Sequence, residues 1–188
     1  MSPRPEAEEP IAGFDPEDER ERRLICDPVM VQGLAWGRPR DGHPEGSVGA
    51  HVADLLRTID RWGEHGERRR ELRFLALVHD ALKSRVQPWR PKTGANHHAV
   101  RARRFAERYT DDERLLVTIE LHDAPYAVWR RMHRTGRFDA AEFQRMLERV
   151  SDLDLFRRFV ELDGSTAGKD PQPVEWLREQ VARRSGAG

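Results

Sequence analysis

Six residues of metal-binding type are predicted to lie on the apolar faces of helices in this chain. They are four histidines and two aspartates: His51, His79, Asp80, His98, His122 and Asp163. Burying such a polar group without a partner costs free energy, and one metal centre would satisfy several of them together. Histidine and carboxylate ligands suit a divalent ion of Fe, Mn, Co, Ni or Zn, and the absence of a cysteine cluster argues against a structural zinc site. The pattern therefore predicts a metalloenzyme.

Helical periodicity separates these histidines from their neighbours. His98 is followed at helical spacing by Ala102 and Phe105, whereas His97 is followed by a row of arginines. We therefore expect His98 to point into the core and His97 to point toward solvent.

The same periodicity selects one aspartate near the C-terminus. Asp163 follows Phe159 on an apolar stripe, whereas Asp154 shares its face with charged residues and is expected at the surface. Asp152 fits either the Asp163 stripe or the start of a helix, so its position stays open at this point.

A structural alternative exists for each of these residues. A single inward histidine is more often a hydrogen-bonded core residue than a ligand, and the chain contains a second His-Asp pair, His122-Asp123. Five inward residues of ligand type on five different helices are harder to explain in that way.

The elements that must position these residues are all predicted to be helices. The helices that carry them are expected over residues 47–62, 67–82, 96–109, 113–122 and 152–163, after a first helix over residues 16–31. The apolar run 74–78 also suits a buried strand, but its long polar approach without a turn favours a helix. We predict an all-α fold, a single bundle of about seven helices with a metal site in its core.

Length and composition limit the class of protein further. The chain has 188 residues, enough for one domain, and its 33 basic residues balance 33 acidic ones, so no global field favours nucleic acid or membrane. Cys26 is the one cysteine, and no apolar stretch has the length of a membrane span, so we expect a cytoplasmic protein. Residues 1–12 are predicted to be disordered, residues 13–184 to form the domain, and residues 185–188 to form a tail.

The segment from His79 to Lys83, which reads HDALK, follows an apolar run and resembles the HD-x-x-K signature of the HD-domain superfamily. The segment HPEGSV ahead of His51 resembles the entry to the first ligand helix of several HD subfamilies, including the module attached to tRNA nucleotidyltransferases. The helix of His98 and the segment FRRFVELD that ends at Asp163 are similar to the third-histidine helix and the terminal aspartate of dinuclear members. The resemblance covers residues 24 to about 170.

The resemblance implies a role for each of the six residues. His51, His79, Asp80 and Asp163 would hold one metal ion, His98 and His122 would hold a second, and Asp80 would bridge the two. A hydroxide shared by two such ions would attack phosphorus while the ions neutralise phosphoryl charge. Asp80 and Lys83 would be catalytic, with Lys83 binding a phosphate oxygen or steadying the nucleophile.

A basic loop that joins two ligand helices is predicted to bind substrate phosphate. It spans residues 83–94 and carries Lys83, Arg85, Arg90 and Lys92 beside Trp89, a combination suited to the phosphate and base of a nucleotide. An ordinary solvated surface loop is the alternative.

These features favour a phosphohydrolase that acts on a small phosphorylated metabolite, a nucleotide or a dinucleotide. A mixed-valent di-iron oxygenase of the same superfamily is the alternative, and a non-catalytic binding module stabilised by metal is the third reading. We expect a small phosphorylated substrate as the partner, and neither a membrane nor a nucleic acid. The sequence leaves the oligomeric state open.

Overall fold

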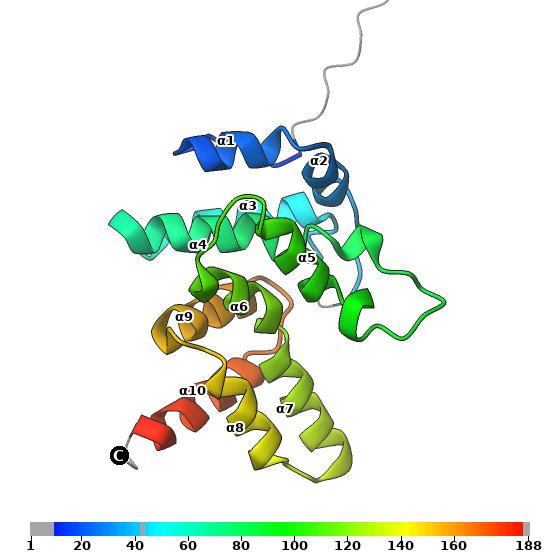
Figure 1. Ribbon diagram of the computed structural model, residues 1–188, viewed down its shortest axis with the longest axis vertical. Helices are drawn as coiled ribbons and strands as arrows, with labels where there is room; N and C mark the ends of the chain where they lie inside the picture. The colour runs from blue at the N-terminus through cyan, green and yellow to red at the C-terminus, as the bar shows by residue number, and fades with distance from the viewer. Residues whose placement is uncertain (1–9, 42–43, 186–188) are drawn as a thin grey trace, which may run out of the picture.

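A computed structural model describes residues 10–41 and 44–185, and the regular elements within these ranges are all helices (Figure 1). The prediction of an all-α fold is confirmed. The α-helices are α1 (Glu19–Ile25), α2 (Pro28–Leu34), α3 (Val48–Arg61), α4 (Gly66–Val78), α5 (His98–Ala106), α6 (Glu113–Leu121), α7 (Ala124–Thr135), α8 (Ala140–Glu148), α9 (Leu153–Gly164) and α10 (Gln172–Ser185). Two short 3-10 helices, η1 (Lys83–Arg85) and η2 (Gly94–Asn96), lie between α4 and α5.

The described ranges hold ten α-helices where about seven were expected, and two differences are instructive. The helix expected over residues 16–31 is divided, because Asp27 caps a new helix by accepting from the Val29 amide and Pro28 occupies its first position. Helix α7 was not predicted, because Pro125 and Val128 are its buried residues and such a face gives little periodic signal.

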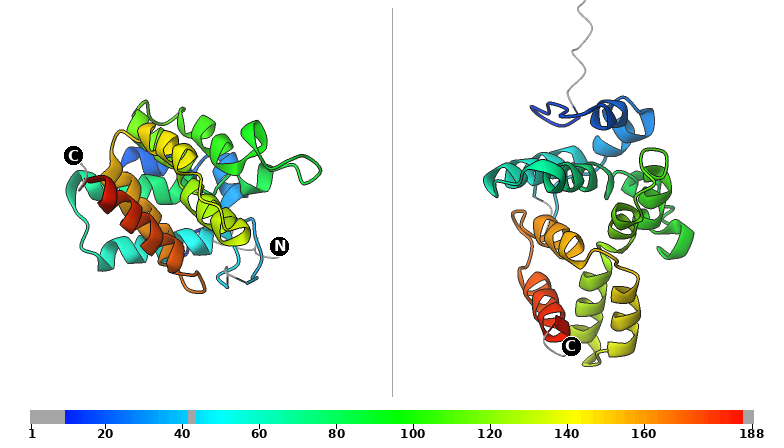
Figure 2. Two further views of the ribbon diagram at one scale, coloured as in Figure 1. Left: turned by 90° about the horizontal axis from the view of Figure 1, so that it is seen from below. Right: turned by 60° about the vertical axis from the view of Figure 1, so that its left-hand side comes forward.

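Two apolar clusters form the core. The larger one joins α1 to α6 with α9, and the smaller one joins α7, α8 and α10 to the ends of α6 and α9. Helices α7, α8 and α10 accordingly lie together at one end of the molecule (Figures 1 and 2). The chain therefore passes from one cluster to the other at His122, which directly follows α6.

Helix α2 lies directly against the chain that follows the His79-Asp80 pair. A Cβ atom added at Gly33 would lie 1.9 Å from the carbonyl oxygen of Ala81, so this contact requires glycine. The backbone next to Asp80 is thereby held from the side of α2 as well as by α4.

A buried ion pair fixes α1 to α4. The Arg73 guanidinium donates to both carboxylate oxygens of Glu21 at 2.7 and 2.8 Å, and the two side chains are 6% and 2% exposed. Removing one partner of a buried pair leaves an uncompensated charge. The pair therefore makes α1 an integral part of the larger cluster.

We expect Arg73→Ala to lower the free energy of unfolding by about 3–5 kcal/mol, because Glu21 would stay buried without its partner. Urea denaturation followed by circular dichroism measures this change. Arg70→Ala is the matched control on α4, because Arg70 is exposed, and it should change stability by no more than about 0.5 kcal/mol. Equal effects of the two substitutions would contradict a structural role for the pair.

The structure describes parts of the chain near both ends of the expected domain. Residues 1–9 of the predicted disordered segment and residues 186–188 of the tail lie outside the described residues, as does His43 ahead of the first ligand helix. Ile11 is 4% exposed and belongs to the larger cluster, so packing begins before residue 13. Among the helices of residues 10–41 and 44–185, each is too short or too polar for a membrane span.

Candidate metal centre

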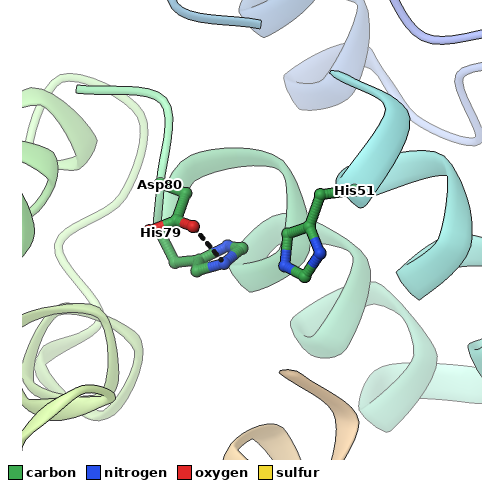
Figure 3. Close-up of side chains that lie close together, drawn as sticks. All are labelled: His51, His79 and Asp80. Carbon is green, nitrogen blue, oxygen red and sulfur yellow. Dashed lines mark ion pairs between the residues drawn. The ribbon is translucent and has the colours of Figure 1, made fainter. Parts of the chain in front are cut away.

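His79 and Asp80 directly follow the C-terminal end of α4. The preceding run from Phe74 to Val78 is fully buried, which carries the pair into the interior, where His79 is 0% and Asp80 4% exposed. The imidazole of His51, from α3, lies across from them (Figure 3). The ring centroids of His51 and His79 are 5.5 Å apart.

Backbone carbonyl groups orient two of the imidazoles. Nδ1 of His79 lies 3.0 Å from the carbonyl oxygen of Ala76, and Nδ1 of His122 lies 2.7 Å from that of Ile119. Because a carbonyl oxygen only accepts, each Nδ1 must carry the proton. Each Nε2 is then left with a lone pair for a metal ion, the arrangement that outer hydrogen bonds give to metal-binding histidines.

Asp163, at the end of α9, faces the same two histidines from the opposite side. Its Oδ1 lies 2.9 Å from Nε2 of His51 and 3.6 Å from Nε2 of His79. Glu45 lies 3.3 Å from the other nitrogen of His51, Nδ1, where a carboxylate can hold the ring in place. The sequence had not pointed to Glu45 as a separate contributor.

The two oxygens of the Asp80 carboxylate face different histidines. Oδ2 lies 3.4 Å from Nε2 of His79, whereas Oδ1 lies 3.4 Å from Nε2 of His98 and 3.8 Å from Nε2 of His122. The carboxylate thus lies between two groups of imidazoles, the position that a bridging ligand would need.

Several of these atoms fit a metal ion better than they fit the protein alone. Asp80 Oδ1, His79 Nε2 and His98 Nε2 are buried and make no hydrogen bond within the described part of the chain. Buried polar atoms of this kind require an explanation, and an ion is one. Ligand atoms come within 4.8 Å of one another in the groups His51–His79–Asp80, His79–His122–Asp163 and Asp80–His98–His122.

The charges of the site are set by its neighbours. Burial raises the pKa of the Asp80 carboxyl, but the adjacent Lys83 and His79 outweigh burial and hold that pKa well below its usual value. Burial likewise raises the pKa of Asp163, and Lys169 and His79 are among the groups that outweigh it. Both carboxyl groups are therefore ionised, as ligands must be.

The histidines differ from one another in charge. Burial lowers the pKa of His79, but in the metal-free site the carboxylates of Asp80 and Asp163 outweigh burial and raise that pKa to about 9. A metal ion that binds Nε2 of His79 would therefore displace the proton from that nitrogen. Burial lowers the pKa of His98 to about 4, in spite of the attraction of Asp80. His98 is therefore a neutral imidazole near pH 7, the form that binds metal.

The structure adds Asp123 and His97 to the surroundings of His98. Asp123 Oδ2 lies 3.2 Å from Nε2 of His98, and His97, His98 and Asp123 form a further group with metal-binding spacing. His97 was expected on a solvated face, but it is half-buried, and its Nδ1 accepts from the Ala99 amide as the cap of α5. Sequence reasoning noted Asp123 in the pair His122-Asp123 but did not place it at the site, because it precedes α7, a helix that was not predicted.

The other aspartates near the C-terminus lie away from this cluster. Asp152 caps α9 by accepting from the Leu155 amide, and its other oxygen contacts Arg114 at 3.3 Å. Asp154 is exposed on α9. Of the two positions left open for Asp152, the structure therefore shows the one at the start of a helix.

Two lysines contact the carboxylates of the cluster. The Lys83 ammonium donates to Asp80, and Lys169 Nζ donates to both Oδ1 and the carbonyl oxygen of Asp163, each at 2.7 Å. Both lysines line a cavity of about 360 Å³ that also reaches Asp80 and His122. Lys169 was not predicted from the sequence, since it lies in a loop without periodic signal.

The rest of the basic loop does not reach this cavity. Arg85, Arg90 and Lys92 are exposed and are not among the residues that line it. Between η1 and η2 the chain projects from the body of the molecule (Figures 1 and 2), with Trp89 77% exposed. Of the predicted phosphate-binding residues, the structure brings Lys83 alone into the described cavity.

The fold and this cluster define an all-α protein whose buried histidines and aspartates could bind metal. The chain is similar to part of the Multifunctional CCA protein of Cupriavidus necator, with 35% identity over 132 residues. The match covers 67% of this chain and 30% of that protein, so the chain spans less than a third of its relative. No protein-family model matches the chain, and no solved structure does.

We expect two metal ions per chain at saturating metal, because the two Asp80 oxygens face separate histidine groups. His98→Ala should bring the content to one ion, measured by elemental analysis of anaerobically purified protein. His65→Ala, at an exposed histidine, should leave two. One ion in the unaltered protein, with no change in His98→Ala, would mean that His98 is not a ligand.

Proposed function

We propose that the chain is an HD-domain phosphohydrolase that acts on a small phosphorylated metabolite of the nucleotide class. The observation that carries this proposal is the Asp80 carboxylate, which lies between two histidine groups at the edge of a cavity that two lysines also line. The similarity to part of a Multifunctional CCA protein supports it, since the sequence resembles the HD module attached to tRNA nucleotidyltransferases.

The six predicted residues would divide between two ions. His51, His79 and Asp163 would hold one, His98 and His122 the other, and Asp80 both. Bound divalent ions at this place supply a Lewis acid and lower the pKa of water. Phe159 packs against the His79 ring at 5.3 Å between centroids, and keeps that imidazole in a fixed orientation.

Lys83 would serve as a fixed positive charge for a phosphate oxygen. Burial lowers its pKa, but Asp80 outweighs burial and raises that pKa above its usual value. An ammonium group of this kind keeps its proton near pH 7, so Lys83 would bind the substrate without transferring a proton to it.

Lys169 would provide a second positive charge in the same cavity. Its ammonium group reaches Asp163 from the loop after α9, and its side chain is 18% exposed. Together with Lys83 it would donate to phosphate oxygens, while bound metal ions would offset the Asp80 and Asp163 carboxylates that the two lysines contact. The two lysines are better placed for the reacting phosphate than Arg85, Arg90 and Lys92, which lie outside the cavity.

Phosphate release from a panel of nucleotides tests the proposal. The protein is purified anaerobically, loaded with Mn, Co or Fe, and assayed with and without oxygen. We expect release with Mn or Co and without oxygen, because hydrolysis needs a Lewis acid and no redox change. A product that carries an oxygen atom from O₂, formed by the iron-loaded protein alone, would contradict hydrolysis and favour the oxygenase.

A further inference from the structure

The cavity beside the histidine and aspartate cluster has a floor and a rim that differ in chemistry. Asp80 and His122 are 4% exposed and lie deep, whereas Tyr126, which lines the same cavity, is 46% exposed and lies at the rim. Pro125, Pro173 and Val174 line the cavity near the starts of α7 and α10, Val160 lines it from α9, and the carboxylates of Asp41, Asp123 and Asp170 also border it. A molecule that fills this space would have a charged end and a flat or apolar end.

Neighbouring side chains on α7 hold the exposed aromatic ring of Tyr126 in place. It lies on the first turn of α7, and its ring is nearly parallel to that of Trp129, with 18° between the planes and 6.3 Å between the centroids. The guanidinium of Arg130 lies 5.6 Å from the Tyr126 centroid. An exposed ring held in this way offers a stacking surface for a planar group.

The size of the cavity limits what can stack there. Its volume of about 360 Å³ is near the lower end of ligand pockets, which range over roughly 300–1,000 Å³. One nucleotide unit suits such a volume better than two. Lys83 and Lys169, which contact the buried carboxylates of Asp80 and Asp163, would bind phosphate, so the planar part of the same molecule would reach the rim.

We propose that the cavity takes a mononucleotide and that Tyr126 stacks on its base while Lys83 and Lys169 bind its phosphate. This inference rests on the proposed function and adds to it the size of the substrate and a residue that recognises the base. Since every base has an aromatic face, stacking on Tyr126 should accept different bases with small preferences. The base-free sugar phosphate should lose this contact.

Adenosine 5′-monophosphate and ribose 5-phosphate test the proposal, because they differ in the base alone. Dissociation constants and kcat/KM are measured for metal-loaded protein with both compounds. In Tyr126→Leu we expect affinity and kcat/KM for the nucleotide to fall by about 10- to 100-fold, the effect of losing one base–aromatic stack. Ribose 5-phosphate should change by no more than about twofold, and the metal content should not change.

Two matched variants show whether the ring itself is responsible. Tyr126→Phe keeps the ring and should behave as the unaltered protein. Trp89→Ala removes an exposed aromatic residue that does not line the cavity, and it should change neither compound. Equal losses for the two compounds in Tyr126→Leu, or equal losses in Tyr126→Leu and Tyr126→Phe, would overturn the proposal.

Measurements of binding and of hydrolysis test the base contact and the phosphohydrolase function separately. Nucleotide that binds in a Tyr126-dependent way but releases no phosphate would support the base contact and contradict the phosphohydrolase. Hydrolysis of ribose 5-phosphate with no preference for the nucleotide would support the phosphohydrolase and overturn the base contact. Absence of both nucleotide binding and hydrolysis would overturn both.

Discussion

Asp80→Asn is expected to abolish metal binding and phosphate release together. An amide has the shape of the carboxylate but lacks its charge, and each Asp80 oxygen faces a different histidine group. Loss of an outer partner of a metal ligand costs about 10- to 100-fold in affinity, so loss of a shared ligand should exceed that. Metal content after dialysis and phosphate release measure the two losses.

Asp154→Asn is the matched control, because Asp154 is exposed on α9 and lies outside the cluster. It should keep full metal content and activity. Circular dichroism must show that Asp80→Asn is folded, since Lys83 loses its ion-pair partner. Full metal occupancy in folded Asp80→Asn would show that Asp80 is not a ligand.

Lys83→Ala is expected to separate catalysis from metal retention. Lys83 lies in the cavity and pairs with Asp80, but an ammonium group cannot bind a metal ion. Removing one preorganised electrostatic group lowers kcat by about 10²–10³-fold. We expect a loss of this size with both ions still bound, measured by steady-state kinetics and elemental analysis of the same preparation.

Lys92→Ala tests a point on which the sequence prediction and the structure disagree. The basic loop was expected to bind substrate phosphate, whereas Lys92 is exposed and does not line the described cavity. We therefore expect kcat and KM both to stay unchanged in Lys92→Ala.

Loss of metal from Lys83→Ala would contradict a role in substrate binding and assign Lys83 to the stability of the metal centre.

The helices that carry the cluster could be predicted because their signals are strong and local. Ser47 caps α3, and the apolar run before His79 leaves α4 no solvated face at that end. Helical spacing then selects one side of each helix. His51, His79 and His122 are accordingly brought together by the fold, as their apolar neighbours indicated.

The surroundings of the cluster could not be predicted, because they depend on tertiary packing and loop geometry. Asp123 precedes α7 and Tyr126 lies in its first turn, and the buried face of this helix is too sparse to be periodic. Lys169 reaches Asp163 from a loop, a contact that spacing along the chain does not encode. Charge composition made residues 83–94 a phosphate-binding candidate, but it does not show whether a loop turns toward a cavity or away from it.

The pairing of His51 with Asp163 joins residues 112 positions apart, so the cluster exists only when α3 and α9 have packed together. An ion held there would bind the folded chain and not the unfolded one. Such a ligand adds about 2.7 kcal/mol to stability at a concentration 100 times its dissociation constant. The midpoint of thermal unfolding would then rise with free metal concentration and fall in chelator. Metal supply would thus change the stability of the fold.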